Sequence, residues 1–276
     1  MMMMAGADVR NFTRLIEALR PSLDRIVIAG GWAHRLYRFH PLAQAPDYPS
    51  LMTADTDVVV PGAPRPAGPD IEESLRAHGF QEEFLGDERP PVTHYTLGRE
   101  EHGFYVEFLT PLAGSGNRRD GAPDATTRLG GVVAQKLRYL ELLLVEPWSI
   151  QLSPSVGFTV EPPALVRIPN AASYIAQKLL IASRRRPPAR AKDVLYIHDT
   201  LELFGRSLAE LHAIWVGRLQ PVLHEQTVRR LRRAIRGLSD AVTDEARMAV
   251  RMALARTLSP ELLTDVCREG LQQVFE

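Results

Sequence analysis

Hydrophobic residues recur with a helical period at both ends of the chain. Phe12, Leu15, Ile16 and Leu19 are spaced as one face of a helix, so residues 8–20 are expected to form an amphipathic helix that ends at Pro21. From residue 170 onward almost the whole chain has helical spacing. The expected helices cover 170–184, 189–204, 207–219, 223–236, 240–257 and 260–274.

Short apolar runs between these ends predict strands. The expected strands lie near 25–29, 55–60, 80–85, 92–98 and 104–109, with two or three more within 149–168. Helices are expected at 31–39 and 70–78, a hairpin turn at 99–103, and either helix or strand at 129–145. The pattern predicts an α+β fold: a small mixed sheet flanked by helices (1–168), followed by an all-helical C-terminal region (169–276).

Composition limits the cellular compartments and the kinds of metal site that are expected for the protein. The chain has 276 residues, with 33 Lys and Arg against 33 Asp and Glu, and a single cysteine, Cys267. No internal disulfide or cysteine metal cluster can form, which favours the cytoplasm. We expect no membrane segment, because no apolar run approaches the roughly 20 residues that span a bilayer. Acidic residues are in excess up to residue 110 and basic residues beyond it.

A glycine pair, Gly30-Gly31, separates the strand expected at 25–29 from the helix that follows. Without side chains, backbone N–H groups at such a turn can approach a phosphate, and the helix N-terminus adds positive potential. The alternative is an ordinary tight turn. The chain contains no G-x-G-x-x-G or P-loop motif, and no H-E-x-x-H or G-x-S-x-G motif, so dinucleotide-binding, P-loop, zinc-protease and α/β-hydrolase functions are not supported.

Three acidic residues lie in apolar strands. Asp55 and Asp57 precede Val58-Val59-Val60 and, at i and i+2, face the same side of a strand. Glu107 lies in the apolar run FYVEFL, where a carboxylate is costly unless it is paired or bound to a metal. If the two strands are neighbours, three carboxylates converge, and such oxygen ligands favour Mg²⁺ or Mn²⁺. The alternative is that these acids lie on a solvated face.

A basic segment, Ser183–Lys192, carries five positive charges in ten residues. It follows Lys178, whose apolar neighbours indicate a partly buried side chain. Lys178 and Lys192 are candidates for phosphate contacts, whereas Asp193 is expected to orient Lys192 or Arg190 rather than to bind metal. The alternative is a solvated turn between two helices.

A second basic run lies on the helix expected at 223–236. Its members are Arg229, Arg230, Arg232, Arg233 and Arg236. Such a run can bind the RNA backbone, but it is more often a solvated helix face.

The acidic and glycine residues together resemble the nucleotidyltransferase superfamily, which has the polymerase-β-like fold. Its pattern is a Gly-Gly or Gly-Ser turn, a helix, Asp-x-Asp on the next strand and a third acid on a later strand. Gly30, Gly31, Asp55, Asp57 and Glu107 occupy these positions in order. The likeness implies a small mixed nucleotidyltransferase sheet and transfer of a nucleoside monophosphate from an NTP.

Within this superfamily, residues 20–205 resemble the bacterial AbiEii-type, toxin-like nucleotidyltransferases. In that group a lysine-bearing helix precedes an Arg-rich turn and a Lys/Arg-Asp helix, here represented by Lys178, Arg184–Arg186, Lys192 and Asp193. Thr53 matches the group, but Met52 stands where arginine is usual, and Glu107 replaces the usual aspartate.

The resemblance implies a Mg²⁺-dependent (or Mn²⁺-dependent) enzyme that modifies a hydroxyl of RNA or protein, with an antitoxin as a further partner. It implies catalytic and metal-binding roles for Asp55, Asp57 and Glu107. It implies substrate-binding roles for Gly30, Gly31, Thr53, Lys178 and Lys192. Met52 favours a second hypothesis, a non-catalytic module that binds nucleotide or RNA. A third is a structural or partner-binding protein that acts through its helical C-terminal region.

Overall fold

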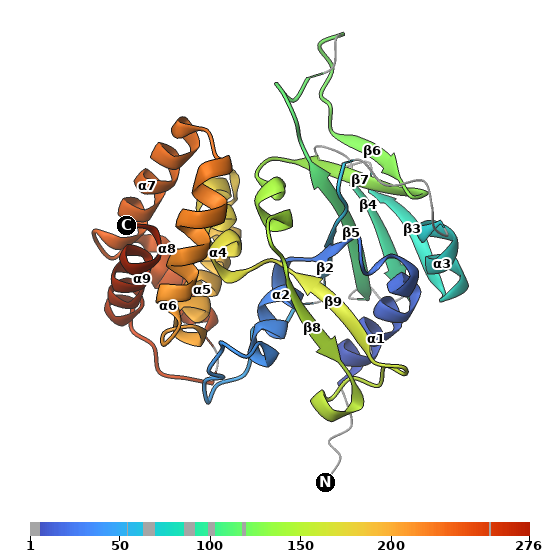
Figure 1. Ribbon diagram of the computed structural model, residues 1–276, viewed down its shortest axis with the longest axis horizontal. Coiled ribbons are helices and arrows are strands. Elements are labelled where there is room, and N and C mark those ends of the chain that lie inside the picture. Colours follow the sequence, from blue (N-terminus) through green and yellow to red (C-terminus); the bar gives the residue numbers. More distant parts are fainter. Residues whose placement is uncertain are drawn as a thin grey trace. The chain divides into compact units, whose positions relative to one another are not determined.

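The computed structural model describes residues 6–53, 55–62, 70–85, 92–98, 103–117, 120–253 and 255–276 (Figure 1). Contacts divide the chain into two units. The sheet unit comprises the residues up to 33 together with 52–169, and the helical unit comprises 34–51 together with 170–276. No helix in the described ranges is long and apolar enough to cross a membrane.

A mixed sheet forms the centre of the sheet unit. Its strands are β1 (Val27–Ile28), β2 (Asp55–Val59), β3 (Phe80–Leu85), β4 (Val92–Leu97), β5 (Phe104–Pro111), β6 (Thr126–Leu129) and β7 (Val132–Leu137). The order is β1-β2-β5-β4-β3, and β7 pairs with both β5 and β6. β5 runs parallel to β2 and β7 and antiparallel to β4. The expected α+β fold with a mixed sheet is therefore confirmed. The antiparallel pairing expected of a β4–β5 hairpin is also confirmed, but residues 99–102 of its turn lie outside the described residues.

Helices α1 (Ala7–Leu19) and α3 (Ile71–Ala77) pack against each other in the sheet unit. The apolar positions of α1 are buried as the sequence predicts, and Phe12 stacks on Trp32 with ring centroids 3.7 Å apart. The Ser74 hydroxyl of α3 donates to the Ala18 carbonyl of α1 at 2.6 Å. A separate hairpin, β8 (Trp148–Leu152) with β9 (Ala164–Ile168), supplies the strands expected within 149–168.

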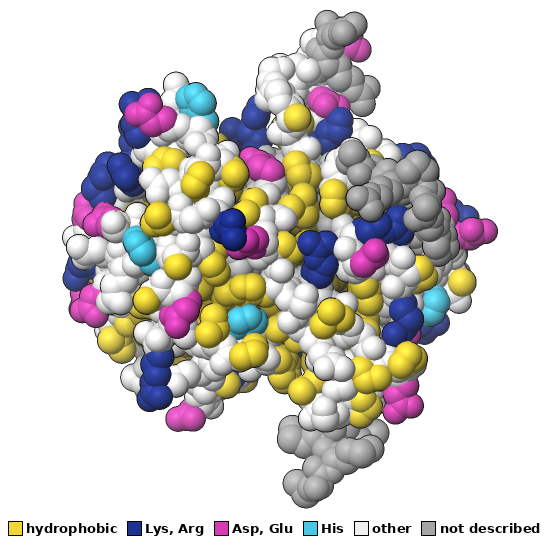
Figure 2. Space-filling model, in the orientation of Figure 1, with side chains coloured by type: hydrophobic (Ala, Val, Ile, Leu, Met, Phe, Trp, Pro, Cys, Tyr) yellow, Lys and Arg dark blue, Asp and Glu magenta, His cyan; other side chains and the backbone are white. Residues whose placement is uncertain are grey.

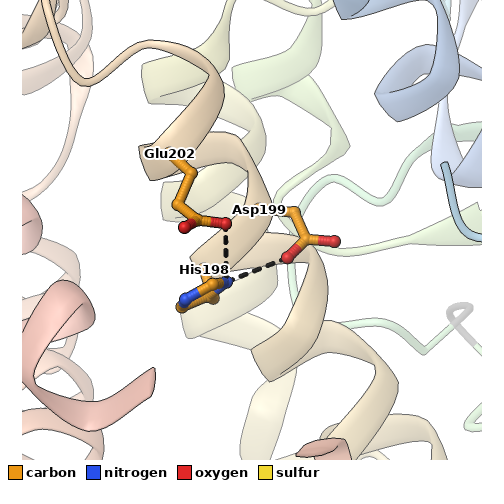
Figure 3. Close-up of side chains that lie close together, drawn as sticks. All are labelled: His198, Asp199 and Glu202. Carbon is orange, nitrogen blue, oxygen red and sulfur yellow. Dashed lines mark hydrogen bonds and ion pairs between the residues drawn. The ribbon is translucent and has the colours of Figure 1, made fainter. Parts of the chain in front are cut away.

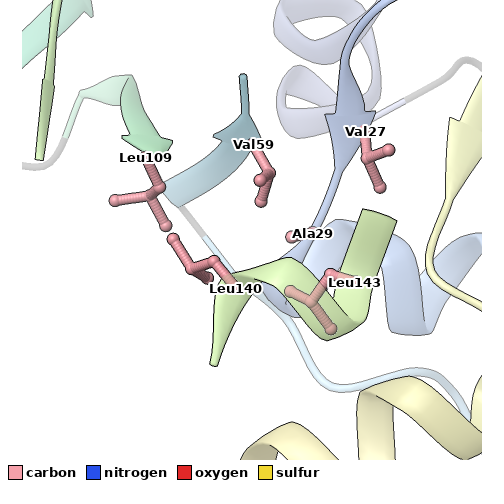
Figure 4. Packing of buried hydrophobic residues seen from close by; sticks show 6 residues of the cluster. All are labelled: Val27, Ala29, Val59, Leu109, Leu140 and Leu143. Atoms are coloured by element: carbon pink, nitrogen blue, oxygen red, sulfur yellow. The ribbon is translucent and has the colours of Figure 1, made fainter. Parts of the chain in front are cut away.

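One apolar cluster fixes the ends of β1, β2 and β5 (Figure 4). It consists of Val27, Ala29, Val59, Leu109, Leu140 and Leu143. Its last two members come from a 3₁₀ segment, Leu140–Leu144, which shows that the ambiguous region 129–145 is mainly strand followed by a short 3₁₀ turn. Replacing a buried leucine of this kind with alanine typically costs about 2–5 kcal/mol. The cluster therefore holds the strand that leads into Gly30.

The helical unit contains α4 (Ala171–Ile181), α5 (Pro187–Leu203), α6 (Leu208–Ile214), α7 (Glu225–Ser239), α8 (Asp244–Met252) and α9 (Pro260–Phe275). A helix lies within each segment expected after residue 170, although α8 is shorter at both ends than the helix expected at 240–257. Asn170, Thr243 and Ser259 cap α4, α8 and α9 by accepting backbone N–H groups. Most of α5 is buried, and it packs against α4, α8 and α9.

An early segment, residues 34–51, belongs to the helical unit. The Gln44 N–H donates to the Leu203 carbonyl at 2.7 Å, and the Ser207 hydroxyl donates to the Leu42 carbonyl at 3.2 Å. Helix α2 (Gly30–Leu36) thus begins in the sheet unit and ends in the helical unit. The sequence pattern indicated one boundary near residue 168 and gave no sign of this early segment. The functional division into domains stays a prediction.

Candidate functional site

Strand β2 presents two carboxylates on one face of the sheet. Asp55 and Asp57 are half-buried, whereas Thr56 and Val58, which point to the opposite face, are completely buried. This alternation follows from the two-residue period of a strand. The apolar face holds the strand in the core, so the two carboxylates share the more accessible face.

Glu107 lies on the strand next to these aspartates. β2 and β5 pair in parallel, with Asp55 opposite Tyr105 and Asp57 opposite Glu107. Residues opposite each other on adjacent strands point to the same face, and the strands are about 4.8 Å apart. Glu107 is half-buried, and its neighbours Val106 and Phe108 are buried on the other face. The structure therefore brings all three predicted acids onto one face.

The pKa of Tyr105 is affected by the negative charges on this face. Burial raises the pKa of its phenol well above the usual value, and the nearby charges of Asp55, Glu107 and Asp57 raise it further. Negative neighbours disfavour phenolate. Tyr105 consequently stays protonated at neutral pH and offers a hydroxyl donor beside the acids.

His94 is a site residue that sequence reasoning missed. It lies on β4 opposite Glu107, and its Nε2 is 2.7 Å from Glu107 Oε1. The imidazole also stacks on the Tyr105 ring, with centroids 4.3 Å apart. The half-buried acid thus has an imidazole at ion-pairing distance, which provides the polar partner that an acid within an apolar strand requires. The alternation of polar and apolar residues in 92–97 could have shown that His94 shares the face of Thr96, but not which strand it meets.

Thr53 positions the first aspartate. Its hydroxyl is buried and donates to the Asp55 carboxylate. Met52, which occupies the position where arginine is usual in the resembled group, has a side chain that is 65% exposed. In this structure the Thr53 hydroxyl therefore binds the Asp55 carboxylate. Its contact with substrate stays a prediction.

Gly30 makes room for Asp57. Its φ of +58° is in the left-handed region, and a Cβ placed on it would lie 1.9 Å from Asp57 Oδ2. The Ala29 N–H donates to the Asp57 carbonyl at 2.8 Å, which fixes the turn against β2. Any residue other than glycine would collide with the carboxylate. Gly31 follows at the beginning of α2.

The oxygen donors on this face fit a hard divalent cation such as Mg²⁺. The absence of a Cβ at Gly30 accommodates the Asp57 carboxylate, and Glu107 lies next to Asp57 in register. The fit is incomplete in one respect, because the Glu107 carboxylate contacts His94. The metal-binding roles of these acids stay predictions.

Lys178 and Lys192 belong to the helical unit. Lys178 is only 6% exposed, and its Nζ lies 2.6 Å from Asp193 Oδ1 and 4.7 Å from the ring centroids of both Tyr174 and Tyr196. Lys192 is half-buried, with its Nζ 5.6 Å from the Tyr196 centroid. Lys178 therefore has a structural role as one half of a buried ion pair. Its contact with substrate stays a prediction, as does that of Lys192.

The expected partners of Asp193 were wrong. Asp193 pairs with Lys178 and, at 3.1 Å, with Arg185, instead of with Lys192 or Arg190. Arg190 pairs with Glu245 of α8 at 2.8 Å. The packing of α4 beside α5 directs the Asp193 carboxylate toward Lys178, and sequence spacing does not reveal that packing.

A second polar cluster lies within the helical unit (Figure 3). In the described part of the chain, His198, Asp199 and Glu202 are the group of potential metal ligands whose atoms lie within 4.8 Å of one another. A cation already contacts two of them, since Arg256 lies 2.6 Å from Asp199 and 3.5 Å from Glu202. Its guanidinium also covers the Tyr48 ring at 3.7 Å. The cluster is thus an ion-pair network that ties the early segment to α5.

His34 lies in the core of this unit. Its imidazole is 1% exposed and contacts Tyr196, with centroids 4.9 Å apart. Neither ring nitrogen has a hydrogen-bonding partner among the described residues. Burial lowers the pKa of His34 to about 4; the nearby Asp199 opposes this change, and Lys178 adds to it. His34 is therefore neutral at physiological pH.

The chain is similar to known nucleotidyltransferases. The family described as Nucleotidyltransferase matches residues 8–216. No curated protein matches the chain. One similar solved structure is an antigenic nucleotidyltransferase-like protein from Paracoccidioides brasiliensis, with 13% identity, a TM-score of 0.43, and coverage of 94% of this chain and 97% of that one.

Another similar structure is MenT4, a nucleotidyltransferase toxin from Mycobacterium tuberculosis H37Rv. It has 14% identity and a TM-score of 0.42, and the match covers 96% of this chain and 82% of that one. At this distance the two likenesses assign neither a substrate nor a partner to the present chain.

Proposed function

Because the chain belongs to the nucleotidyltransferase family, we propose that it transfers the nucleoside monophosphate of an NTP to a hydroxyl of RNA or protein. The observation that carries the proposal is the register of β2 and β5, which puts Asp57 beside Glu107 on the face that also holds Asp55. In the reaction a bond forms between the acceptor oxygen and the α-phosphorus. The bond from the α-phosphorus to the β-phosphate oxygen breaks, and pyrophosphate leaves.

The residues have separate roles in this proposal. Asp55, Asp57 and Glu107 hold Mg²⁺ or Mn²⁺, which when bound lowers the pKa of the acceptor hydroxyl and steadies the leaving pyrophosphate. Thr53 keeps the Asp55 carboxylate in place. Glu107 helps to take the acceptor proton, and His94 orients its carboxylate. Gly30 and Gly31 would contact the triphosphate through their backbone N–H groups. Lys178 and Lys192 are further candidates for phosphate contacts.

Incubation with Mg²⁺ and each α-labelled NTP, with and without cellular RNA, tests the proposal. We expect labelled RNA or labelled protein together with pyrophosphate release. Asp57→Asn removes one charge at the site and should abolish labelling. Glu73→Gln makes the same change at an exposed position on α3 and should leave labelling intact. Equal labelling by the wild type and Asp57→Asn would refute the assigned site.

The second candidate function is a nucleotide-binding or RNA-binding module without turnover. The exposed Met52, where the resembled group has arginine, favours it. It predicts binding of NTP and Mg²⁺ without pyrophosphate release. Restoring the charge with Met52→Arg gives a further comparison: if the missing arginine limits turnover, this variant should label faster than the wild type.

A toxin function with an antitoxin partner, acting in the cytoplasm, is the biological role that the AbiEii-type resemblance supports. Induced expression in a bacterial host should then arrest growth. The Asp57→Asn variant, expressed to the same level, should allow growth. Growth arrest by both the wild type and the variant would show that toxicity does not depend on nucleotide transfer.

A further inference from the structure

The two basic runs of the sequence meet at one cavity of the helical unit. This cavity has a volume of about 490 Å³ and is lined by residues of α4, α5, α7 and α8 and of the turn after α4. Arg184 and Arg190 come from the first run, and Arg230 and Arg233 come from the second. About 40 residues separate the two runs in sequence, so their meeting is a product of the fold.

The lining of the cavity is positively charged. Its cations are Lys178, Arg184, Arg190, Arg230 and Arg233, and its acids are Asp193 and Glu245. Both acids already have cationic partners, because Glu245 pairs with Arg190 and Asp193 pairs with Lys178 and with Arg185 outside the lining. Within the lining itself, cations outnumber acids by three, and this local excess of positive charge favours an anion.

Helix α7 separates its arginines into two faces. Arg230, Arg233, Ala234 and Gly237 line the cavity at i, i+3, i+4 and i+7, the spacing of one helix face. Arg229, Arg232 and Arg236 are not part of the lining, and Arg229 pairs with Glu225 at 3.3 Å. Figure 2 shows Lys and Arg side chains gathered along the edge of the helical unit that α7 occupies. Part of the basic run thus points into a cavity and is not merely a solvated face.

The uncharged part of the lining is mainly apolar, with Ser183 and Thr243 as its polar members. Leu179, Val194, Ile197 and Leu238 are buried residues that contribute to it. The volume is near the lower end of the roughly 300–1,000 Å³ typical of small-molecule sites, so a ligand of mononucleotide size fits and a nucleic-acid duplex does not. An apolar group and an anionic group are therefore both accommodated.

We propose that this cavity binds a nucleoside phosphate, with the phosphate held by Arg184, Arg230 and Arg233 and the base against the apolar residues. The ligand is either a free nucleotide or one nucleotide of a single-stranded RNA. Arginine suits this role, because its planar guanidinium binds phosphate oxygens in pairs. The proposal does not depend on the carboxylates of the sheet unit.

Equilibrium binding in EDTA tests the site without metal-dependent binding elsewhere. The probes are the four nucleoside 5′-monophosphates, adenosine as the phosphate-free control, and a fluorescein-labelled single-stranded RNA octamer. Removing one arginine–phosphate contact typically costs about tenfold to a hundredfold in affinity. Arg233→Ala and Arg230→Ala should weaken binding by this factor, and adenosine should not bind.

Arg232→Ala is the matched control, since it removes the same charge from the same helix outside the lining. It should change affinity by less than threefold, and all the replaced arginines are exposed, so the fold should persist. Equal weakening by Arg232→Ala and Arg233→Ala, or no binding of any probe, would overturn the proposal. If only the octamer responds to Arg233→Ala, the ligand is part of an RNA chain; if the monophosphates respond, it is a free nucleotide.

The same measurement separates this site from the proposed catalytic one. Asp57→Asn should bind the probes as the wild type does in EDTA, even though it loses labelling with Mg²⁺. Absence of enzymatic labelling with intact, Arg233-dependent binding would refute the enzyme and keep the cavity. Intact labelling with no binding in EDTA would refute the cavity site and keep the enzyme.

Discussion

The buried His34 should make the stability of the protein fall as the solution is acidified. The pKa of this imidazole is lowered to about 4 in the fold, whereas the ordinary value is 6.5. Between these two pH values the unfolded chain binds a proton that the folded chain rejects. By linkage, the contribution of His34 to stability is fully present above pH 6.5 and is lost as the pH falls toward 4.

The size of this effect follows from the same two values. A pKa change of this extent corresponds to about 3 kcal/mol when the titration is complete. At pH 5 the unfolded chain is almost fully protonated at this residue, and the linkage relation gives a loss of about 2 kcal/mol relative to pH 7.5. That amount is a large part of a typical folding free energy of about 5–15 kcal/mol.

Urea unfolding of the wild type and of His34→Leu at pH 7.5 and pH 5, followed by far-ultraviolet circular dichroism, isolates the contribution. Other groups titrate in both proteins, so the quantity of interest is the difference between their pH dependences. The wild type should lose about 2 kcal/mol more than the variant. Equal losses would refute the reasoning. If the variant does not fold, the pKa of His34 measured by NMR decides instead, and a value near 6.5 would contradict the assignment.

Three substitutions and one labelling experiment test the packing further. Gly30→Ala should cost about 1–2 kcal/mol from its left-handed backbone alone, whereas Gly237→Ala, within α7 and facing open space, should stabilise the protein in urea unfolding. Lys178→Met leaves the buried Asp193 without its main partner and should cost about 3–5 kcal/mol; a loss below 1 kcal/mol would contradict a structural role for the pair. Burial raises the pKa of Cys267 to about 12, so iodoacetamide should modify this thiol only in unfolded protein, and rapid native labelling would contradict its burial.

Local patterns predicted most elements of the fold, because the spacing of apolar residues in each element reflects which of its side chains are buried. The alternation of 55–59 and the helical periods after residue 170 correspond to β2 and to α4–α9. The region 129–145 was ambiguous because a strand and a 3₁₀ turn share one apolar stretch. The docking of 34–51 on α5 could not be predicted, since backbone hydrogen bonds such as Gln44 to Leu203 leave no mark on side-chain pattern.

The candidate site was predictable to the extent that it is local. Asp55 and Asp57 share a face because of their spacing alone. The position of Glu107 depends on which strands pair and in which register, and these are properties of the whole sheet. The same register brings His94 to Glu107, and no local pattern identifies that partner. Similarly, the partner of Asp193 depends on helix packing, so the expected ion pair was wrong.

The placement of residues 34–51 has a consequence for how the protein can be divided and made. The polypeptide passes between the two units three times. A fragment that starts at residue 170 would lack Tyr48, whose ring lies under the Arg256 guanidinium. A ribosome finishes this early stretch long before it synthesises the helices that receive it. The helical unit can therefore complete its folding only late in translation, when its C-terminal helices pack around residues 34–51, which were synthesised much earlier.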